Sequence, residues 1–431
     1  DILIQGETIV GIGQTLDIFG ETKIIDATGK LIFPGVIDPH THMGIPIKSM
    51  TSADNFASGS RSALHGGVTT ILDFTVLEPG QSLSESLNTR RSLAENSFCD
   101  VGLHINITRF EPELLKEIPF LISSGFTSFK VFTTYKEAGM MLTYEQIEVV
   151  AEIIAEHQGI LMVHSEDDQV IKNASGAYAD RTKTHPKYHS LSRPADSETV
   201  AVQRLGEISE RTQCTIYIVH LNTAAGLAMA TEYPRLKVET CPHYLFLTDD
   251  VYNRDDGRMF VASPPLRKDE DREALWQGIK DELVHTIGSD HCPFCLDDKA
   301  QDIPFQDIPN GMGGVETLFP TLLSEFINRD IDLSLLSKLT SQNPAQIFGL
   351  QLLKGSLSLG ANADLLIVDP KTPDIGWEKQ LETSLDWNGY SGLPALFPEI
   401  VIKGGEIVVS QGCIQEPPPG KLLRSFSTLE E

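Results

Sequence analysis

Eight short runs rich in β-branched and aliphatic residues alternate with helical patterns through the middle of the chain. Strands that alternate with helices form a parallel sheet with helical crossovers, and eight such units close into a barrel. The pattern therefore predicts an α/β fold, a (β/α)8 TIM barrel at residues 31–354. The expected strands lie at residues 31–37, 69–74, 101–107, 128–132, 160–164, 215–220, 237–240 and 286–289, and the helical patterns include 53–65, 82–94, 112–123, 144–157 and 197–211.

The two ends of the chain share one pattern, in which a strand, a glycine turn and a second strand follow each other. The segment DILIQGETIVGIG opens the chain, and EIVIKGGEIVVSQG stands near its end. Strands are expected at 1–4, 8–12, 23–26, 363–368, 399–403 and 406–410. We predict a smaller β-sandwich built from both termini, residues 1–30 and 355–414, with a C-terminal tail at 415–431. Since the chain opens at Asp1 on an expected strand, a few residues are expected to precede it.

Composition narrows the class of partner. With 431 residues, 41% of them hydrophobic, the chain can bury a large core and a second domain. Its 60 acidic and 34 basic residues give a formal net charge of -26, which repels phosphate backbones and anionic lipid, so neither a nucleic acid nor a membrane is expected as a partner. The six cysteines do not suggest a disulfide framework, and Cys292 and Cys295 are interpreted as loop thiols. The cytoplasm is the expected compartment.

Polar residues follow several of the expected strands where each one ends. They are His40 and His42 after the first, His164 at the end of the fifth, His220 at the end of the sixth and Asp290 after the eighth. Catalytic groups of such barrels lie at the carboxyl ends of strands, and side chains at i and i+2 of a strand share one side. Each residue alone fits a hydrogen-bonded histidine or a capping aspartate. Together they predict a site for one or two divalent cations with nitrogen and oxygen ligands.

Lys130 stands between apolar residues in the fourth expected strand, where burial of an unpaired ammonium is costly and lowers its pKa. One interpretation pairs it with a carboxylate such as Asp290, or lets it reach the rim. The other is a neutral amine carboxylated by CO2, which turns the lysine into a carboxylate able to bridge two metals. The histidines and Asp290 on the same rim favour the second interpretation.

Eight motifs, taken together and in order, carry a resemblance that covers nearly the whole chain. The sequence resembles the metal-dependent amidohydrolase superfamily, and closely its cyclic amidohydrolases of the dihydropyrimidinase/D-hydantoinase type. That resemblance implies a binuclear zinc centre and homotetramers or dimers. The motifs are VIDPHTHM, GGVTTILDF, SFKVFTTYK, VHSED, VETCPHYLFL, ASPPLRKDED, IGSDHCPF and IPNGMGGVE.

The resemblance also implies a role for each site residue. His40, His42 and Asp290 would bind one ion, His164 and His220 the other, and carboxylated Lys130 and a hydroxide would bridge them. Asp290 would act as general base and acid, and the Tyr135 hydroxyl and the main chain at Ser263 and Asn310 would contact the substrate. The implied reaction opens a dihydropyrimidine or a 5-monosubstituted hydantoin to an N-carbamoyl amino acid.

Two alternatives remain at this point, an allantoinase and a non-catalytic scaffold related to dihydropyrimidinase, although scaffolds of that kind have lost ligands that this chain retains. Dihydroorotate is not expected as the substrate. Dihydroorotases, which resemble this family, carry an arginine where Gly44 stands here, and the next cation is Lys48. The surrounding loop, residues 43–47, is apolar.

Four further residues are candidates for supporting the ligands from behind: His189, Arg193, Glu239 and His243. The remaining histidines are expected to be structural or exposed.

Overall fold

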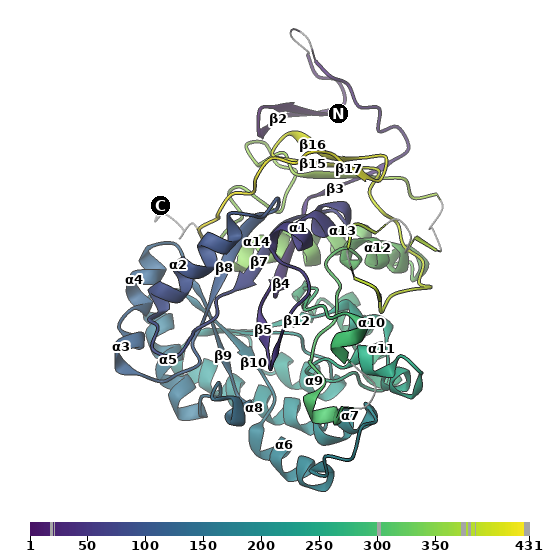
Figure 1. The fold of residues 1–431 in the computed structure, drawn as a ribbon. Helices are drawn as coiled ribbons and strands as arrows, with labels where there is room; N and C mark the ends of the chain where they lie inside the picture. The colour runs from purple at the N-terminus through teal and green to yellow at the C-terminus, as the bar shows by residue number, and fades with distance from the viewer. Residues whose placement is uncertain are drawn as a thin grey trace.

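The computed structural model describes residues 1–17, 20, 22–299, 303–371, 376–377, 381–383 and 385–425. Its larger part is the expected barrel, drawn below a smaller β-layer in Figure 1. Eight parallel strands follow one another around the sheet, and a bridge between Thr41 and His291 brings its two ends together. The barrel prediction is thus confirmed. The strands are β4 (Val36–Thr41), β7 (Val68–Phe74), β8 (Asp100–Asn106), β9 (Ser128–Phe132), β10 (Ile160–His164), β11 (Thr215–Ile218), β12 (Leu236–Thr240) and β13 (Thr286–Ile287).

Helices cover the outside of the barrel. The expected helix at 112–123 is two helices, because Pro119 lacks an N–H and its ring clashes with the preceding turn. Capping boxes begin two others, with Ser82 paired to Glu85 and Thr143 paired to Gln146. The main outer helices are α1 (Phe56–His65), α2 (Leu83–Ala94), α3 (Pro112–Leu115), α4 (Ile118–Ser123), α5 (Tyr144–Glu156), α8 (Asp196–Thr212), α9 (Ala224–Thr231), α11 (Asp269–Lys280) and α12 (Leu318–Asn328).

The β-layer is built from both ends of the chain, as expected. A five-stranded antiparallel sheet has the order β17-β16-β15-β14-β3, and a separate pair, β1–β2, packs on it through the buried Ile9. Its strands are β1 (Ile2–Gln5), β2 (Thr8–Ile12), β3 (Leu31–Pro34), β14 (Leu365–Val368), β15 (Ile400–Lys403), β16 (Glu406–Ser410) and β17 (Cys413–Ile414).

Two strand predictions in this region are wrong. Residues 23–26 form no strand, and Ile24 is 75% exposed. The expected strand at 31–37 divides at Gly35: β3 joins the antiparallel sheet and β4 joins the barrel. A Cβ at Gly35 would lie 2.3 Å from Thr69 Oγ1, so only glycine lets the chain cross there. The domain boundaries stay a prediction. β3 begins one residue after the boundary predicted at residue 30, yet it is paired with β14 of the β-layer.

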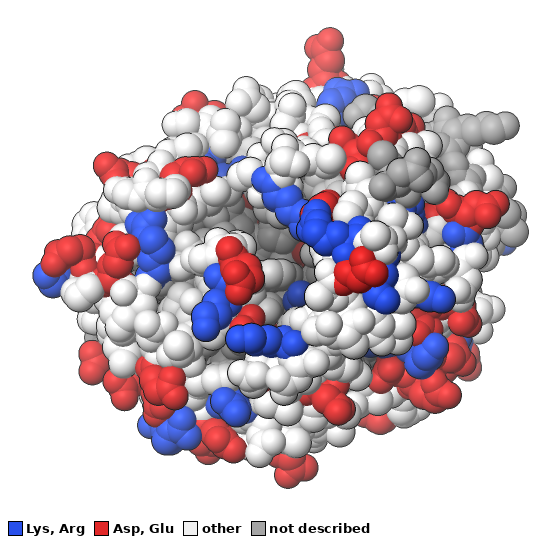
Figure 2. Space-filling view, turned by 60° about the horizontal axis from the view of Figure 1, so that its bottom comes forward, with Lys and Arg blue, Asp and Glu red and all other residues white. Residues whose placement is uncertain are grey.

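Short elements lie on the carboxyl side of the barrel, where α6 directly follows β10. Viewed from this side, the molecule is hollowed near its centre, and Lys and Arg side chains border the hollow together with a few acidic ones (Figure 2). The elements are β5 (Pro46–Ile47), β6 (Met50–Thr51), η1 (Lys136–Ala138), α6 (Asp168–Ser175), η2 (Gly176–Tyr178), α7 (Lys187–Ser192), α10 (Pro242–Phe246), η3 (Asp249–Asn253), η4 (Gly257–Phe260), η5 (Leu296–Lys299) and η6 (Phe305–Asp307).

The last described segments lie toward the amino ends of the barrel strands. Three helical segments, α13 (Leu333–Ser337), the π-helical η7 (Lys338–Gln342) and α14 (Asn343–Ile347), precede the return to the β-layer. The tail then lies along the start of β8, where the Val101 amide donates to Lys421 O at 2.8 Å and the Leu423 amide donates to Val101 O at 2.7 Å. Among the described helices, none combines the length and the apolar character that a membrane crossing requires.

A buried ion network joins the barrel to the β-layer. Lys354 Nζ lies 2.6 Å from both Asp100 Oδ2 and Asp364 Oδ2, and Lys403 Nζ lies 3.1 Å from Asp100 Oδ1. Asp100 begins β8 and Lys403 ends β15, so the network ties the two parts at the end of the barrel remote from the hollow.

Replacing Lys354 with methionine should destabilise the fold, because Asp100 then keeps only Lys403 and Asp364 keeps no ammonium partner among the described residues. Loss of one partner of a buried ion pair costs ~3–5 kcal/mol, and we expect a fall of that order in the free energy of unfolding, measured by urea denaturation. The matched control is Lys421→Met. Lys421 pairs with Glu7 at the surface, both side chains being 56% exposed, so its loss should change stability by less than ~1 kcal/mol. Equal shifts for the two variants would contradict the network's role.

Candidate metal centre

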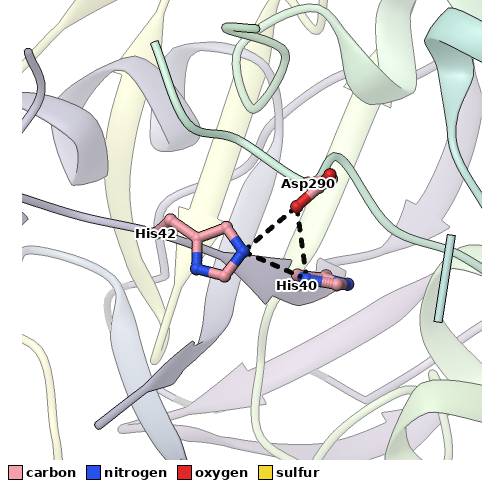
Figure 3. Close-up of side chains that lie close together, drawn as sticks. All are labelled: His40, His42 and Asp290. Atoms are coloured by element: carbon pink, nitrogen blue, oxygen red, sulfur yellow. Dashed lines mark hydrogen bonds and ion pairs between the residues drawn. The ribbon is translucent and has the colours of Figure 1, made fainter. Parts of the chain in front are cut away.

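Two histidines and an aspartate converge at the carboxyl ends of β4 and β13 (Figure 3). His40 Nε2 lies 3.2 Å from both His42 Nε2 and Asp290 Oδ1, and His42 Nε2 lies 3.1 Å from that oxygen. His40 is buried, whereas the His42 side chain is 20% exposed. The i, i+2 spacing thus places both imidazoles on one side of the chain, and closure of the barrel brings Asp290 to them.

A second pair of imidazoles adjoins the first. His164 ends β10 and His220 follows β11 by two residues; His164 Nδ1 lies 2.9 Å from His220 Nε2. The ring centroids of His40 and His220 are 5.5 Å apart, so the two pairs are neighbours. Four imidazoles and one carboxylate from four strands therefore share one rim.

Buried carboxylates fix the tautomers of two of these histidines. Glu239 Oε1 lies 2.7 Å from His40 Nδ1, and Glu166 Oε2 lies 2.7 Å from His164 Nε2, so these ring nitrogens carry the protons. The lone pairs of His40 Nε2 and His164 Nδ1 consequently face the site. At His40 the lone pair meets Asp290 Oδ1, which is also an acceptor; two acceptors at 3.2 Å repel unless a cation lies between them. The donor set fits a divalent cation with nitrogen and oxygen ligands.

The protonation states suit metal binding. Burial raises the pKa of Asp290, but the nearby His40 and His42 more than offset it, so the pKa falls below its ordinary value and the carboxylate stays ionised. Burial lowers the pKa of His164 to about 4, despite the opposing effect of Glu166, which keeps the imidazole neutral. A neutral imidazole and an ionised carboxylate are the forms that bind metal.

Lys130 lies inside the barrel, with 2% of its surface exposed, on β9 opposite Met162 of β10. Its Nζ is 5.1 Å from the ring centroid of Phe74 and 5.3 Å from that of Phe132. Within the described ranges no carboxylate lies within 4.0 Å of it, so the pairing with Asp290 is not seen. Burial lowers its pKa to about 8, although Glu239 and Asp290 act in the opposite direction.

Three of these chemically important residues have left-handed backbone conformations. The φ angle is 67° at Tyr135, 44° at His220 and 49° at Asp290. Non-glycine residues in this region carry ~1–3 kcal/mol of strain each and persist only where the surroundings hold them. At His220 the holding contact is its amide, which donates to Glu239 Oε1 at 2.9 Å. The strained conformations thus lower the stability of the fold and direct these side chains toward the rim.

The residues expected to contact substrate also lie together. The Tyr135 ring centroid is 5.0 Å from that of His164, and Ser263 lies near its hydroxyl. Ser263 Oγ accepts from Asn310 Nδ2 at 2.9 Å. Burial raises the pKa of Tyr135 to about 12, so its hydroxyl keeps the proton that it would donate. The three residues, from loops after β9, β12 and β13, face one space beside the imidazoles.

The supporting residues are partly those anticipated. Glu239 holds His40, Arg193 pairs with Glu166, and His189 Nε2 donates to Ala262 O at 2.7 Å. For His243 the described residues offer neither ring nitrogen a hydrogen bond, so its support stays a prediction. Glu166 was missed, and its signal was its place two residues after His164 at a strand end.

Other polar residues make structural contacts. His65 binds Glu316, His104 binds Ser128 and Pro39 O, and His291 lies beside Asp54. Cys292 and Cys295 are unbonded thiols, the first buried and the second half-buried. Met43, expected in the apolar loop, packs instead into the core with 1% of its surface exposed.

Comparison with known proteins agrees with this geometry. Residues 31–408 match the model of the amidohydrolase family. The chain is 35% identical over 426 residues to a protein named D-hydantoinase from Geobacillus stearothermophilus, covering 95% of this chain and 89% of that protein. A solved dihydropyrimidinase from Brevibacillus agri superposes with a TM-score of 0.95 at 30% identity, covering 98% and 95% of the two chains. An L-hydantoinase (dihydropyrimidinase) from Arthrobacter aurescens gives 0.87 at 25% identity, covering 96% and 93%.

Replacing Glu239 with glutamine should weaken metal binding, because the ring proton of His40 and the amide of His220 lose a charged acceptor. Carboxylates behind metal ligands contribute ~10–100-fold to metal affinity, and we expect a loss of that size by competitive chelator titration. Glu316→Gln is the matched control, since Glu316 Oε1 lies 2.7 Å from His65 Nδ1, away from the centre. If Glu316→Gln weakened metal binding as much, the effect would be one of general stability.

Proposed function

Because the chain belongs to the amidohydrolase family and is a metal-dependent hydrolase of cyclic amides, we propose that it opens a dihydropyrimidine or a 5-monosubstituted hydantoin to an N-carbamoyl amino acid. One observation carries the proposal: four imidazoles and Asp290 share a rim with Tyr135, Ser263 and Asn310. The intact set of ligand residues argues against a non-catalytic scaffold.

For the metal, we propose two Zn²⁺ ions, one held by His40, His42 and Asp290 and the other by His164 and His220, with carboxylated Lys130 between them. The unpaired, buried Lys130 supports this assignment, since a pKa of about 8 leaves part of the amine neutral and able to add to CO2. The carbamate that forms is an anion, which removes the cost of an uncompensated cation. When bound, such ions make water a better nucleophile at neutral pH and polarise the amide carbonyl.

The chain's own residues would complete the reaction. Asp290 would accept a proton from the attacking water and deliver it to the ring nitrogen as the C–N bond breaks. The Tyr135 hydroxyl would donate to the oxygen that gains charge, a contribution of ~2.7–4 kcal/mol if it resembles other single donors of this kind. The main chain at Ser263 and Asn310 would match the N–H and C=O edge of the ring.

The cations near the site support a neutral ring as substrate. Lys48 Nζ donates to Gln306 O at 2.8 Å and Ile308 O at 2.5 Å, and Arg193 is paired with Glu166. Both are therefore occupied, and Gly44 offers no side chain. A substrate carboxylate without a cation in this partly closed site would lose several kcal/mol of binding. A cytoplasmic location and assembly into tetramers or dimers stay predictions.

A substrate panel tests the proposal. On one preparation, dihydrouracil or a 5-alkyl hydantoin should be hydrolysed with a kcat/KM at least ~100-fold above that of dihydroorotate, which corresponds to ~2.7 kcal/mol. Preference for dihydroorotate would refute the argument from the occupied cations. Hydrolysis of allantoin alone would identify the chain as an allantoinase instead.

Lys130→Ala should remove both the bridging ligand and the activity, because two cations then repel across an incomplete site. Metal per chain, measured by mass spectrometry, and turnover should fall together, and short carboxylic acids should partly restore turnover. The control is Lys237→Ala, a half-buried lysine on β12 outside the centre, which should retain both. Two metals per chain with normal turnover in Lys130→Ala would exclude the bridging role.

A further inference from the structure

Lys299 is a buried cation without a counter-charge. It ends η5, 2% of its surface is exposed, and no carboxylate of the described residues lies within 4.0 Å of its Nζ. Its ammonium donates to three main-chain carbonyls, those of Met259 at 3.0 Å, Val261 at 2.9 Å and Gly311 at 2.7 Å. Three N–H donors thus meet three acceptors, a match that suits a tetrahedral ammonium.

The three carbonyls belong to the two segments expected to contact substrate. Val261 lies two residues before Ser263, and Gly311 directly follows Asn310. The segments also bind each other, since the Gly311 amide donates to Val261 O at 2.9 Å. The ammonium therefore lies behind the substrate edge and ties the two loops together without reaching the space in front of them.

Other contacts hold these loops as well: Asn310 Nδ2 donates to Ser263 Oγ at 2.9 Å, and Pro264 O accepts from the Tyr244 hydroxyl at 2.7 Å. Gly311 has a φ of 145°, and a Cβ there would lie 2.4 Å from Cys292 O, so the chain passes too close for a side chain. On the other loop, Ala262 O accepts from His189 Nε2 at 2.7 Å. Burial lowers the pKa of Lys299 to about 7, although Cys292 and Asp298 act in the opposite direction.

We propose that Lys299 is a positioning residue that sets the distance between the Ser263 and Asn310 main chains to match the ureide edge of the ring. The inference rests on the proposed function for its substrate, but the contacts of the ammonium do not. Its hydrogen bonds go to the carbonyls of Met259, Val261 and Gly311 and to none of the proposed metal ligands, so the main expected effect is on substrate recognition.

The test compares Lys299→Met with Lys354→Met, which removes another buried lysine at the opposite end of the barrel. For dihydrouracil and a 5-alkyl hydantoin alike, Lys299→Met should raise KM by ~10–100-fold, the range expected when buried hydrogen bonds to the ring are imperfectly made. Metal content should be unchanged and kcat should change less than KM. Lys354→Met should lower thermal stability and leave KM as it is. Lys299→Gln, which keeps two N–H donors, should give an intermediate KM.

Hydrogen exchange supplies a readout independent of turnover. The amide of Gly311 should exchange faster in Lys299→Met than in the wild type, and no faster in Lys354→Met. An unchanged KM on substrates that the wild type hydrolyses, or unchanged exchange at Gly311, would overturn the inference. So would a KM in Lys299→Gln equal to that in Lys299→Met. If Lys299→Met does not fold, Lys299→Gln takes its place in both measurements. A wild type inactive on both rings would refute the proposed function alone, and the exchange experiment would still decide the role of Lys299.

Discussion

Glu239 is the contact on which the metal centre depends. From β12 it accepts the ring proton of His40, the amide of His220 and the hydroxyl of Tyr217, which lie on or directly after β4 and β11. Without that carboxylate, no acceptor among the described residues binds His40 Nδ1, and only ring contacts such as that with Phe74 remain to orient the imidazole. The same contact holds His220 in a left-handed conformation. One buried side chain therefore sets a tautomer, a ring orientation and a strained backbone.

The cationic side chains around the site have different kinds of partner. Arg193 is paired with a carboxylate, whereas Lys48 and Lys299 are bound to main-chain carbonyls. Carbonyl dipoles fix an ammonium without adding a negative charge, which matters in a chain with a net charge of -26. Among the described residues, a fourth cation, Lys130, has neither a carboxylate nor a main-chain carbonyl bound to its Nζ. That difference is the physical reason to expect chemical modification at Lys130 and a holding role at Lys299.

Much of the architecture could be predicted because the carboxyl ends of parallel strands meet at one edge of the sheet, which brings the residues at those ends together. Once β10 and β11 are recognised, His164 and His220 must lie at the same end of the sheet as His40. This rule does not reach residues in loops, and Lys299 follows no period that could have revealed it. Glu166 did carry a signal, since it stands two residues after His164 at the end of β10. Apolar runs also do not show which sheet they join: residues 31–37 are buried in two sheets, and only the close approach at Gly35 divides them. The apolar residues at 23–26 predict a strand, but apolar character alone does not show whether a segment is buried, and Ile24 is 75% exposed.

The division at Gly35 has a mechanical consequence. β3 is bonded into the antiparallel sheet, β4 carries His40, and a single residue separates them. The chain has no slack there to absorb movement, so a tilt of the β-layer would be transmitted along β4 to His40 at the rim of the barrel. The β-layer and the geometry of the candidate metal centre are thus mechanically coupled through a single glycine.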